Sequence, residues 1–254
     1  MDETTPPSWG LDEEVQGAVL IESARRLMLE GDYEGAVGVA EELLDADPAD
    51  VDALLLVADA APRYGHGEVG VLASRQARRL GAETAVLEAA ALLAACEVEP
   101  ALAVADERLG VAPGDARAHA VRGQALEVLG RLAESDEALA RAHALRPDAY
   151  PAPLGVADTA WPGLLRQARA GLCDDVEART DGWEFSFLPA PTPERLRSSS
   201  PPIPPGVHAL TYDGGAVPLC ELYTRALTRG CGDTEELVLR LVAAIEGEVA
   251  HLDG

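Results

Sequence analysis

The last residues of the chain hold its most specific chemical pattern, the run Gly247-Glu248-Val249-Ala250-His251. A zinc-binding helix can place two histidines at positions i and i+4 on one face, with a glutamate after the first histidine that polarises the attacking water. Glu248 and His251 stand at the glutamate and second histidine positions of that pattern. Gly247 stands at the first ligand position, and glycine has no side chain with which to bind a metal. The pattern therefore retains only one of its two metal ligands.

Zinc binding at this helix would need substitute ligands from elsewhere in the chain. The nearest candidates in the sequence are Glu246, Asp253, His208 and Cys220, and no spacing shows that they converge. We therefore interpret His251 as an ordinary surface or core histidine and Glu248 as a solvated or hydrogen-bonded helix carboxylate. Under this interpretation no cofactor is expected. Zinc, with Glu248 as the catalytic base and His251 as a ligand, belongs to the alternative.

Composition limits the location and the partners of the chain. Its 254 residues have a formal net charge of −24, which would repel phosphate backbones and anionic membrane surfaces. The four cysteines form no C-x-x-C pair, which indicates free thiols in a reducing compartment. The acidic N-terminus has no apolar signal segment, and no apolar run is long enough to span a membrane. We predict a cytoplasmic protein with no nucleic-acid or membrane partner.

Residues 17–149 show an internal period of small residues, glycine turns and prolines. Pro113 and Pro147 lie 34 positions apart, and the run Gly31-Asp32-Tyr33 has a counterpart in Gly130-Arg131-Leu132. Such a period is typical of stacked helix pairs, because one pair cannot bury its apolar stripe alone. Following a tail over 1–16, we predict four helical repeats. Their ranges are 17–50, 51–81, 82–115 and 116–149.

This period resembles that of the tetratricopeptide (TPR) family, and the resemblance implies an α-helical superhelix. It further implies that a protein or peptide binds in the concave groove formed by the first helix of each pair. The matching groove positions are Arg25, Met28, Leu55, Asp59, Val86, Leu93, Arg117, Gln124 and Glu127. In the alternative interpretation the array only supports the rest of the chain and binds no groove ligand.

The run Gly65-His66-Gly67-Glu68-Val69-Gly70 fits the G-x-G-x-x-G dinucleotide-binding pattern. That pattern binds phosphate only where it follows a strand and begins a helix within a β-α-β unit. Here it follows a helical run within the second repeat. We therefore predict that it is the turn between two helices.

The pattern changes after the linker 150–160, and residues 161–254 predict a small α+β domain. Strictly alternating apolar residues indicate a strand over Trp183–Leu188. Asp233 and Glu236 form a capping box at the start of the last helix. The other predicted elements are a helix over Trp161–Arg179, a loop over 189–206, and strands over Val207–Tyr212 and Val217–Tyr223 with an Asp213-Gly214-Gly215 turn between them.

The order of these elements is similar to that of the minimal zincin-like metallopeptidases of bacteria. The matching segments are the run from Pro205 to Gly214, the run Glu221-Leu222-Tyr223-Thr224-Arg225, and the helix from Asp233 that ends in the Glu248 and His251 pattern. The resemblance implies a zincin-like fold over 161–254. Gly247 departs from the family pattern at the first zinc ligand, which places catalysis in doubt.

Together these patterns predict an α-helical TPR superhelix followed by a small α+β zincin-like domain. The leading hypothesis is a non-catalytic protein-interaction module, in which the metal-less zincin-like domain holds peptides without cleaving them. The alternative is an active zinc metallopeptidase with a non-standard ligand set. In a third hypothesis the C-terminal domain only caps the repeats.

Overall fold

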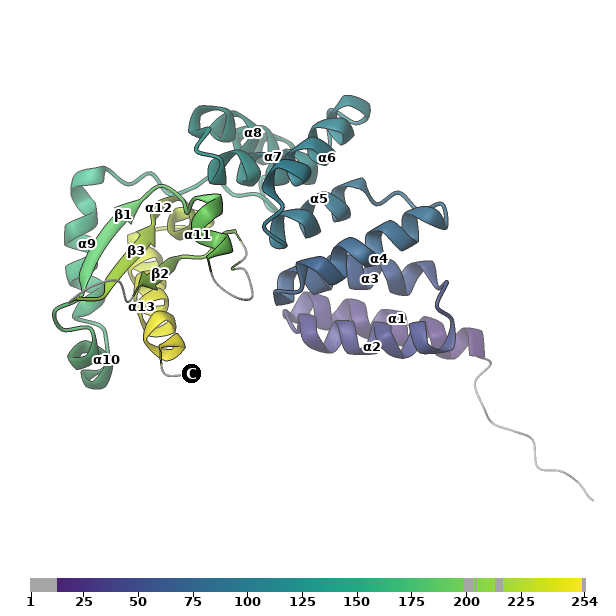
Figure 1. Cartoon of the computed structure of the whole chain (residues 1–254), viewed down its shortest axis with the longest axis horizontal. Helices are drawn as coiled ribbons and strands as arrows, with labels where there is room; N and C mark the ends of the chain where they lie inside the picture. Colours follow the sequence, from purple (N-terminus) through teal and green to yellow (C-terminus); the bar gives the residue numbers. More distant parts are fainter. Residues whose placement is uncertain (1–12, 199–202, 204, 213–216, 253–254) are drawn as a thin grey trace, which may run out of the picture. The chain divides into compact units, whose positions relative to one another are not determined.

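The computed structural model describes residues 13–198, 203, 205–212 and 217–252 (Figure 1). The chain divides into two compact units, Met1–Ala95 and Cys96–Gly254, and the division falls inside the third predicted repeat. Most of the predicted tail, the turn at 213–215 and the candidate ligand Asp253 lie outside the described residues.

The first unit is a series of antiparallel helices in which each helix packs against the next (Figure 1). Its helices are α1 (Glu13–Glu30), α2 (Tyr33–Ala46), α3 (Val51–Ala60), the short 3₁₀ helix η1 (Ala61–Tyr64), α4 (Gly67–Arg79) and α5 (Ala85–Ala94). Asp32 and Asp50 are the N-caps of α2 and α3. Their carboxylates accept hydrogen bonds from the backbone N–H groups of Gly35 and Ala53, respectively. Helix α3 also contacts α1 and α5, so that the first helices of successive pairs are neighbours.

Close approach of helices explains the glycines between α3 and α4. Gly65 ends η1 with a φ of 94°, a conformation that favours glycine. A Cβ atom at Gly67 would lie 2.4 Å from the backbone nitrogen of Ala95, at the end of α5. Gly65 and His66 thus form an inter-helix turn, as predicted, whereas Gly67–Gly70 is the first turn of α4; the run follows helices rather than a strand.

The second unit begins with the helices α6 (Val98–Val111), α7 (Ala116–Val128) and α8 (Leu132–Leu145). Helix α7 begins at Asp115, which accepts hydrogen bonds from the backbone N–H groups of Arg117 and Ala118. A Cβ atom at Gly123 would lie 2.6 Å from Leu139, so this glycine lets α7 and α8 pack closely. Each of the four predicted repeat ranges contains two α-helices, the second range also contains η1, and α1 begins before the first range.

The rest of the second unit is a three-stranded sheet with helices packed on it (Figure 1). The strand order is β1-β3-β2, with β1 parallel and β2 antiparallel to the central strand β3. Its elements are η2 (Asp158–Ala160), α9 (Trp161–Arg169), α10 (Asp174–Arg179), β1 (Glu184–Leu188), α11 (Pro193–Arg197), β2 (Ala209–Tyr212), β3 (Leu219–Tyr223), α12 (Thr224–Thr228) and α13 (Thr234–His251).

Alternation along β3 divides the sheet into two buried faces. Cys220 and Leu222 share a core with Trp161 of α9 and with Leu237 and Leu241 of α13. On the opposite face, Tyr223 packs with Leu210 of β2 and Ala226 of α12, against partly buried residues that include Ile203 and Val207.

Two predictions on this part of the chain were wrong. The helix expected over Trp161–Arg179 is divided into α9 and α10, because Cys173 adopts an extended conformation and begins a new helix. The segment 189–206 is not only a loop, since Thr192 caps the short helix α11 within it.

The terminal helix begins as predicted. The Asp233 carboxylate accepts a hydrogen bond from the backbone N–H of Glu236. The Glu236 side chain in turn accepts from the backbone N–H of Gly232, one residue before the position expected in a capping box.

Candidate functional site

The terminal helix α13 places its three pattern residues in different environments. Gly247 is exposed, and among the described residues no atom beyond the neighbouring backbone of its own helix lies within 4 Å of the position that its Cβ would take. His251, one turn later, is also exposed. Glu248 is half-buried against the sheet, and this burial raises the pKa of its carboxyl group, although Thr211 and His251 partly oppose the effect. The face that would bind a metal therefore points to solvent.

The candidate substitute ligands are not gathered around His251. Burial, with the positive charges of Arg240 and Arg229, lowers the pKa of His208, which places this histidine beside arginines. Cys220 is fully buried on β3, and burial raises its pKa to about 12. Over the described ranges, no three His, Cys, Asp or Glu side chains are grouped so that they could hold a metal ion. These residues do not fit a catalytic zinc site, which needs three protein ligands and a water.

A second buried carboxylate, which the sequence analysis did not identify, lies on the other face of the sheet. The Glu221 carboxylate accepts hydrogen bonds from Arg195 Nη2 at 3.0 Å and from the Tyr223 hydroxyl at 2.9 Å. The guanidinium of Arg195 also stacks on the ring of Tyr212, 4.0 Å from its centroid. Both oxygens of Glu221 are thus engaged, and the network fastens α11 to the sheet.

The predicted groove positions are divided between the two units, and the burial of their side chains differs. In the first unit Arg25 is exposed, whereas Leu93 is buried in the helix core and presents no surface to a ligand. In the second unit Glu127 is buried as well. The remaining positions are partly buried, namely Met28, Leu55, Asp59, Val86, Arg117 and Gln124.

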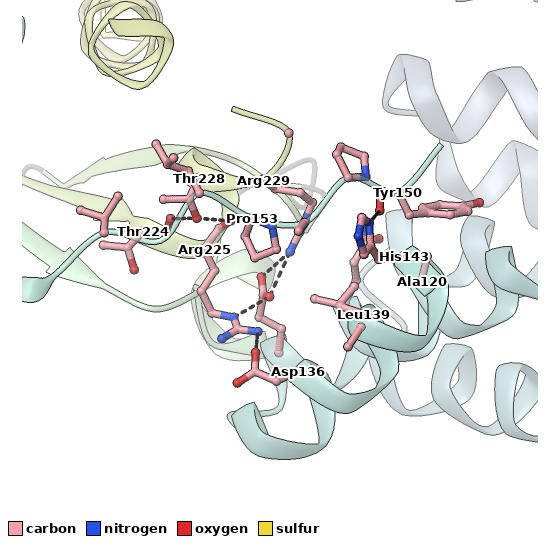
Figure 2. Close-up of a pocket in the computed structure, with 18 of the residues that line it drawn as sticks. Ala120, Asp136, Leu139, His143, Tyr150, Pro153, Thr224, Arg225, Thr228 and Arg229 are labelled. Atoms are coloured by element: carbon pink, nitrogen blue, oxygen red, sulfur yellow. Dashed lines mark hydrogen bonds and ion pairs between the residues drawn. The ribbon is translucent and has the colours of Figure 1, made fainter. Parts of the chain in front are cut away.

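Glu127 is buried because two arginines of the same unit bind it, Arg225 and Arg229, which are labelled in Figure 2. Its carboxylate accepts hydrogen bonds from Arg225 Nε at 2.8 Å and from Arg229 Nη2, which is 2.9 Å from both oxygens. Arg225 also donates to Asp136 at 2.5 Å and to Ser135 at 3.3 Å. We call these five residues the Glu127 clamp. It joins the α7–α8 pair to α12, the short helix that the sequence analysis did not predict.

A cavity of about 740 Å³ lies beside the Glu127 clamp, entirely within the second unit (Figure 2). One wall comes from α7 and α8, a second from Ala149 and residues 150–156 of the predicted linker, and a third from α12. The linker is held in place by a hydrogen bond from the Leu154 backbone N–H to the Thr228 carbonyl. The apolar lining residues are Ala120, Leu139, Ala140, Ala149, Pro151, Ala152, Pro153, Leu154, Val156 and Trp161.

Polar groups occupy defined positions in this mostly apolar cavity. Gln124, His143 and Asp158 line it together with the charged residues of the Glu127 clamp. His143 Nδ1 lies 2.9 Å from the Tyr150 carbonyl oxygen. Of the predicted groove positions, the structure brings Gln124 and Glu127 to this cavity. The linker and α12 were not predicted to contribute, because neither shows a periodic signal.

Comparison with known proteins adds little to these observations. No family model matches the sequence, and no curated protein matches it either. Among solved structures, "MamA RS-1 ArsTM double mutant" is 23% identical with a TM-score of 0.42, over 52% of this chain and 75% of that one. "MamA AMB-1 P212121" is 21% identical with a TM-score of 0.41, over 53% and 75% of the two chains. At these scores the helix packing described above, and not the similarity, defines the fold.

Within the described part of the chain, no helix is both long enough and apolar enough to cross a bilayer.

Proposed function

We propose that this chain is a non-catalytic protein-interaction module that binds a peptide segment of its partner in the cavity beside the Glu127 clamp. The single observation that carries the proposal is the cavity itself. Its volume is in the range typical of ligand sites, and its lining is mostly apolar with a few placed polar groups. Helix pairs that expose one face commonly bind proteins, and two of the predicted groove positions line this cavity.

The proposal treats the region 161–254 as a zincin-like shape that no longer supports hydrolysis. The order of strands and terminal helix supports this assignment, and Gly247 removes one ligand of the pattern. Glu248 without a metal-bound water has no nucleophile to activate. The proposed partner is thus a protein or peptide, bound without cleavage and without a cofactor, in the cytoplasm.

Selection from a library of displayed random peptides tests this proposal. Immobilised wild-type protein should enrich peptides that an Ala140→Trp variant binds poorly, because Ala140 is an exposed residue of the cavity wall and an indole there takes up part of the space that a peptide side chain would occupy. We expect the affinity of an enriched peptide to fall by about tenfold or more, the loss that follows from about 1.4 kcal/mol of apolar contact.

Ala144→Trp is the matched control, since Ala144 is exposed on the same helix but does not line the cavity. It should bind the enriched peptides as the wild type does. Peptides that bind all three proteins equally would show that the cavity is not the binding site.

A further inference from the structure

We infer that the partner segment carries a basic residue, arginine or lysine, among apolar side chains. This inference rests on the proposed function, because it identifies the kind of peptide that the same cavity accepts. The cavity leaves one negative charge without a counter-charge among its lining residues.

The two arginines that line the cavity are already neutralised. Arg229 donates to both oxygens of Glu127, and Arg225 binds Glu127 and Asp136. Their side chains are only 22% and 27% exposed, for Arg225 and Arg229 respectively. Their positive charge is therefore matched within the Glu127 clamp.

The carboxylates at the cavity are more accessible than the arginines. The Asp136 side chain is 65% exposed, although it binds Arg225 through one oxygen. Asp158 is exposed and forms no ion pair with any described residue. The cavity thus has one carboxylate more than it has arginines, and its exposed charge is negative.

His143 adds a hydrogen-bond acceptor to these carboxylates. Because the Tyr150 carbonyl can only accept a hydrogen bond, the Nδ1 atom of His143 must carry the proton in their contact. In the neutral ring Nε2 is then an acceptor. A guanidinium or ammonium group of a partner, which only donates, can therefore pair with Asp158, with Asp136 or with this nitrogen.

The competing occupant is an acidic segment bound to Arg229. That segment would share Arg229 with Glu127 and approach the unpaired Asp158 carboxylate. It would also approach a chain with a formal net charge of −24, which repels anions over long range. The observed charges therefore favour the basic segment, and the acidic one becomes an outcome of the test.

The test is the composition of the peptides that a displayed random library yields against the full chain. We expect peptides whose binding is lost in Ala140→Trp to combine arginine or lysine with apolar residues. Replacing that basic residue by glutamine in a synthetic copy of an enriched peptide should weaken binding about twofold to fivefold, the range for an exposed ion pair. The Asp158→Asn variant should bind the basic peptide more weakly and the glutamine peptide equally well.

Glu137→Gln is the matched charge control, because Glu137 is exposed on α8 and does not line the cavity. It should leave the preference for the basic peptide unchanged. Cavity-dependent peptides that carry acidic or no charged residues would overturn this inference and leave the proposed function standing. If no enriched peptide depends on the cavity, both fail. If Asp158→Asn and Glu137→Gln weaken binding of the basic peptide equally, the preference arises from the net charge of the chain and not from the cavity. That result would also overturn the inference.

Discussion

Burial of the Glu248 carboxylate destabilises the folded protein at neutral pH. Because burial raises its folded-state pKa, the folded protein holds this proton more tightly than the unfolded chain does. The ionised group therefore destabilises the fold at pH 7. This destabilisation diminishes as the pH falls through the raised pKa, and it disappears below the pKa of the unfolded state.

A Glu248→Gln variant should consequently be more stable than the wild type at pH 7. The difference in unfolding free energy between the two proteins should shrink as the pH is lowered from 7 toward 4.5, as measured by urea unfolding at each pH. Because the two proteins differ only at residue 248, the difference between their unfolding free energies cancels the contribution of the other carboxylates. A difference that is constant with pH, or one that favours the wild type, would contradict the burial of this group.

At the scale of single residues, the sequence was informative where a side chain acts on its immediate neighbours. Asp233 was correctly identified as a helix cap, because its partner lies three residues away. The Glu221 network could not be predicted, since Arg195 lies on a different element 26 positions earlier in the chain. Likewise, the groove pattern marked Glu127, but only the tertiary structure shows that Arg225 and Arg229 already bind it.

At the scale of elements, the Glu127 clamp is expected to hold α12 against the α7–α8 pair. A Glu127→Gln variant would remove the carboxylate that binds Arg229 and leave Arg225 paired with Asp136 alone. Removing one partner of a buried ion pair costs about 3 kcal/mol or more. We expect a loss of this order in the unfolding free energy, together with faster proteolysis in the linker that Leu154 fastens to Thr228.

Glu137→Gln serves as the comparison for this prediction, since an exposed substitution on α8 should change stability by less than about 0.5 kcal/mol. If both variants unfold alike, the clamp does not hold the elements together. Helix α12 could not be predicted from the sequence, because its five residues are too few to show a helical period. Helices α2 and α8 were predicted because each is long enough to show a helical period.

At the scale of the whole molecule, each unit has core clusters of its own, and among the described residues those of the first unit share no residue with those of the second. Leu54 belongs to the core of the first unit and Leu222 to that of the second. We expect two separable unfolding transitions in calorimetry. A Leu54→Ala substitution, which removes about 2–5 kcal/mol of core packing, should lower only one of them.

Leu222→Ala should lower only the other transition. A single transition that both substitutions shift would show that the two units unfold as one. The division between Ala95 and Cys96 was not predicted, because the 34-residue period continues across it. Periodicity reports which residues form each helix pair, and it does not report whether neighbouring helices share one core.

The linker between Tyr150 and Val156 forms one wall of the cavity, and this position has an evolutionary consequence. A pocket bounded by a helix pair, a connecting segment and a following domain exists in none of the three parts alone. It arises only when they are joined with a connection of suitable length. Recombination that exchanged either flanking part would therefore lose the pocket, so the junction is the part of this chain that selection for binding would constrain most.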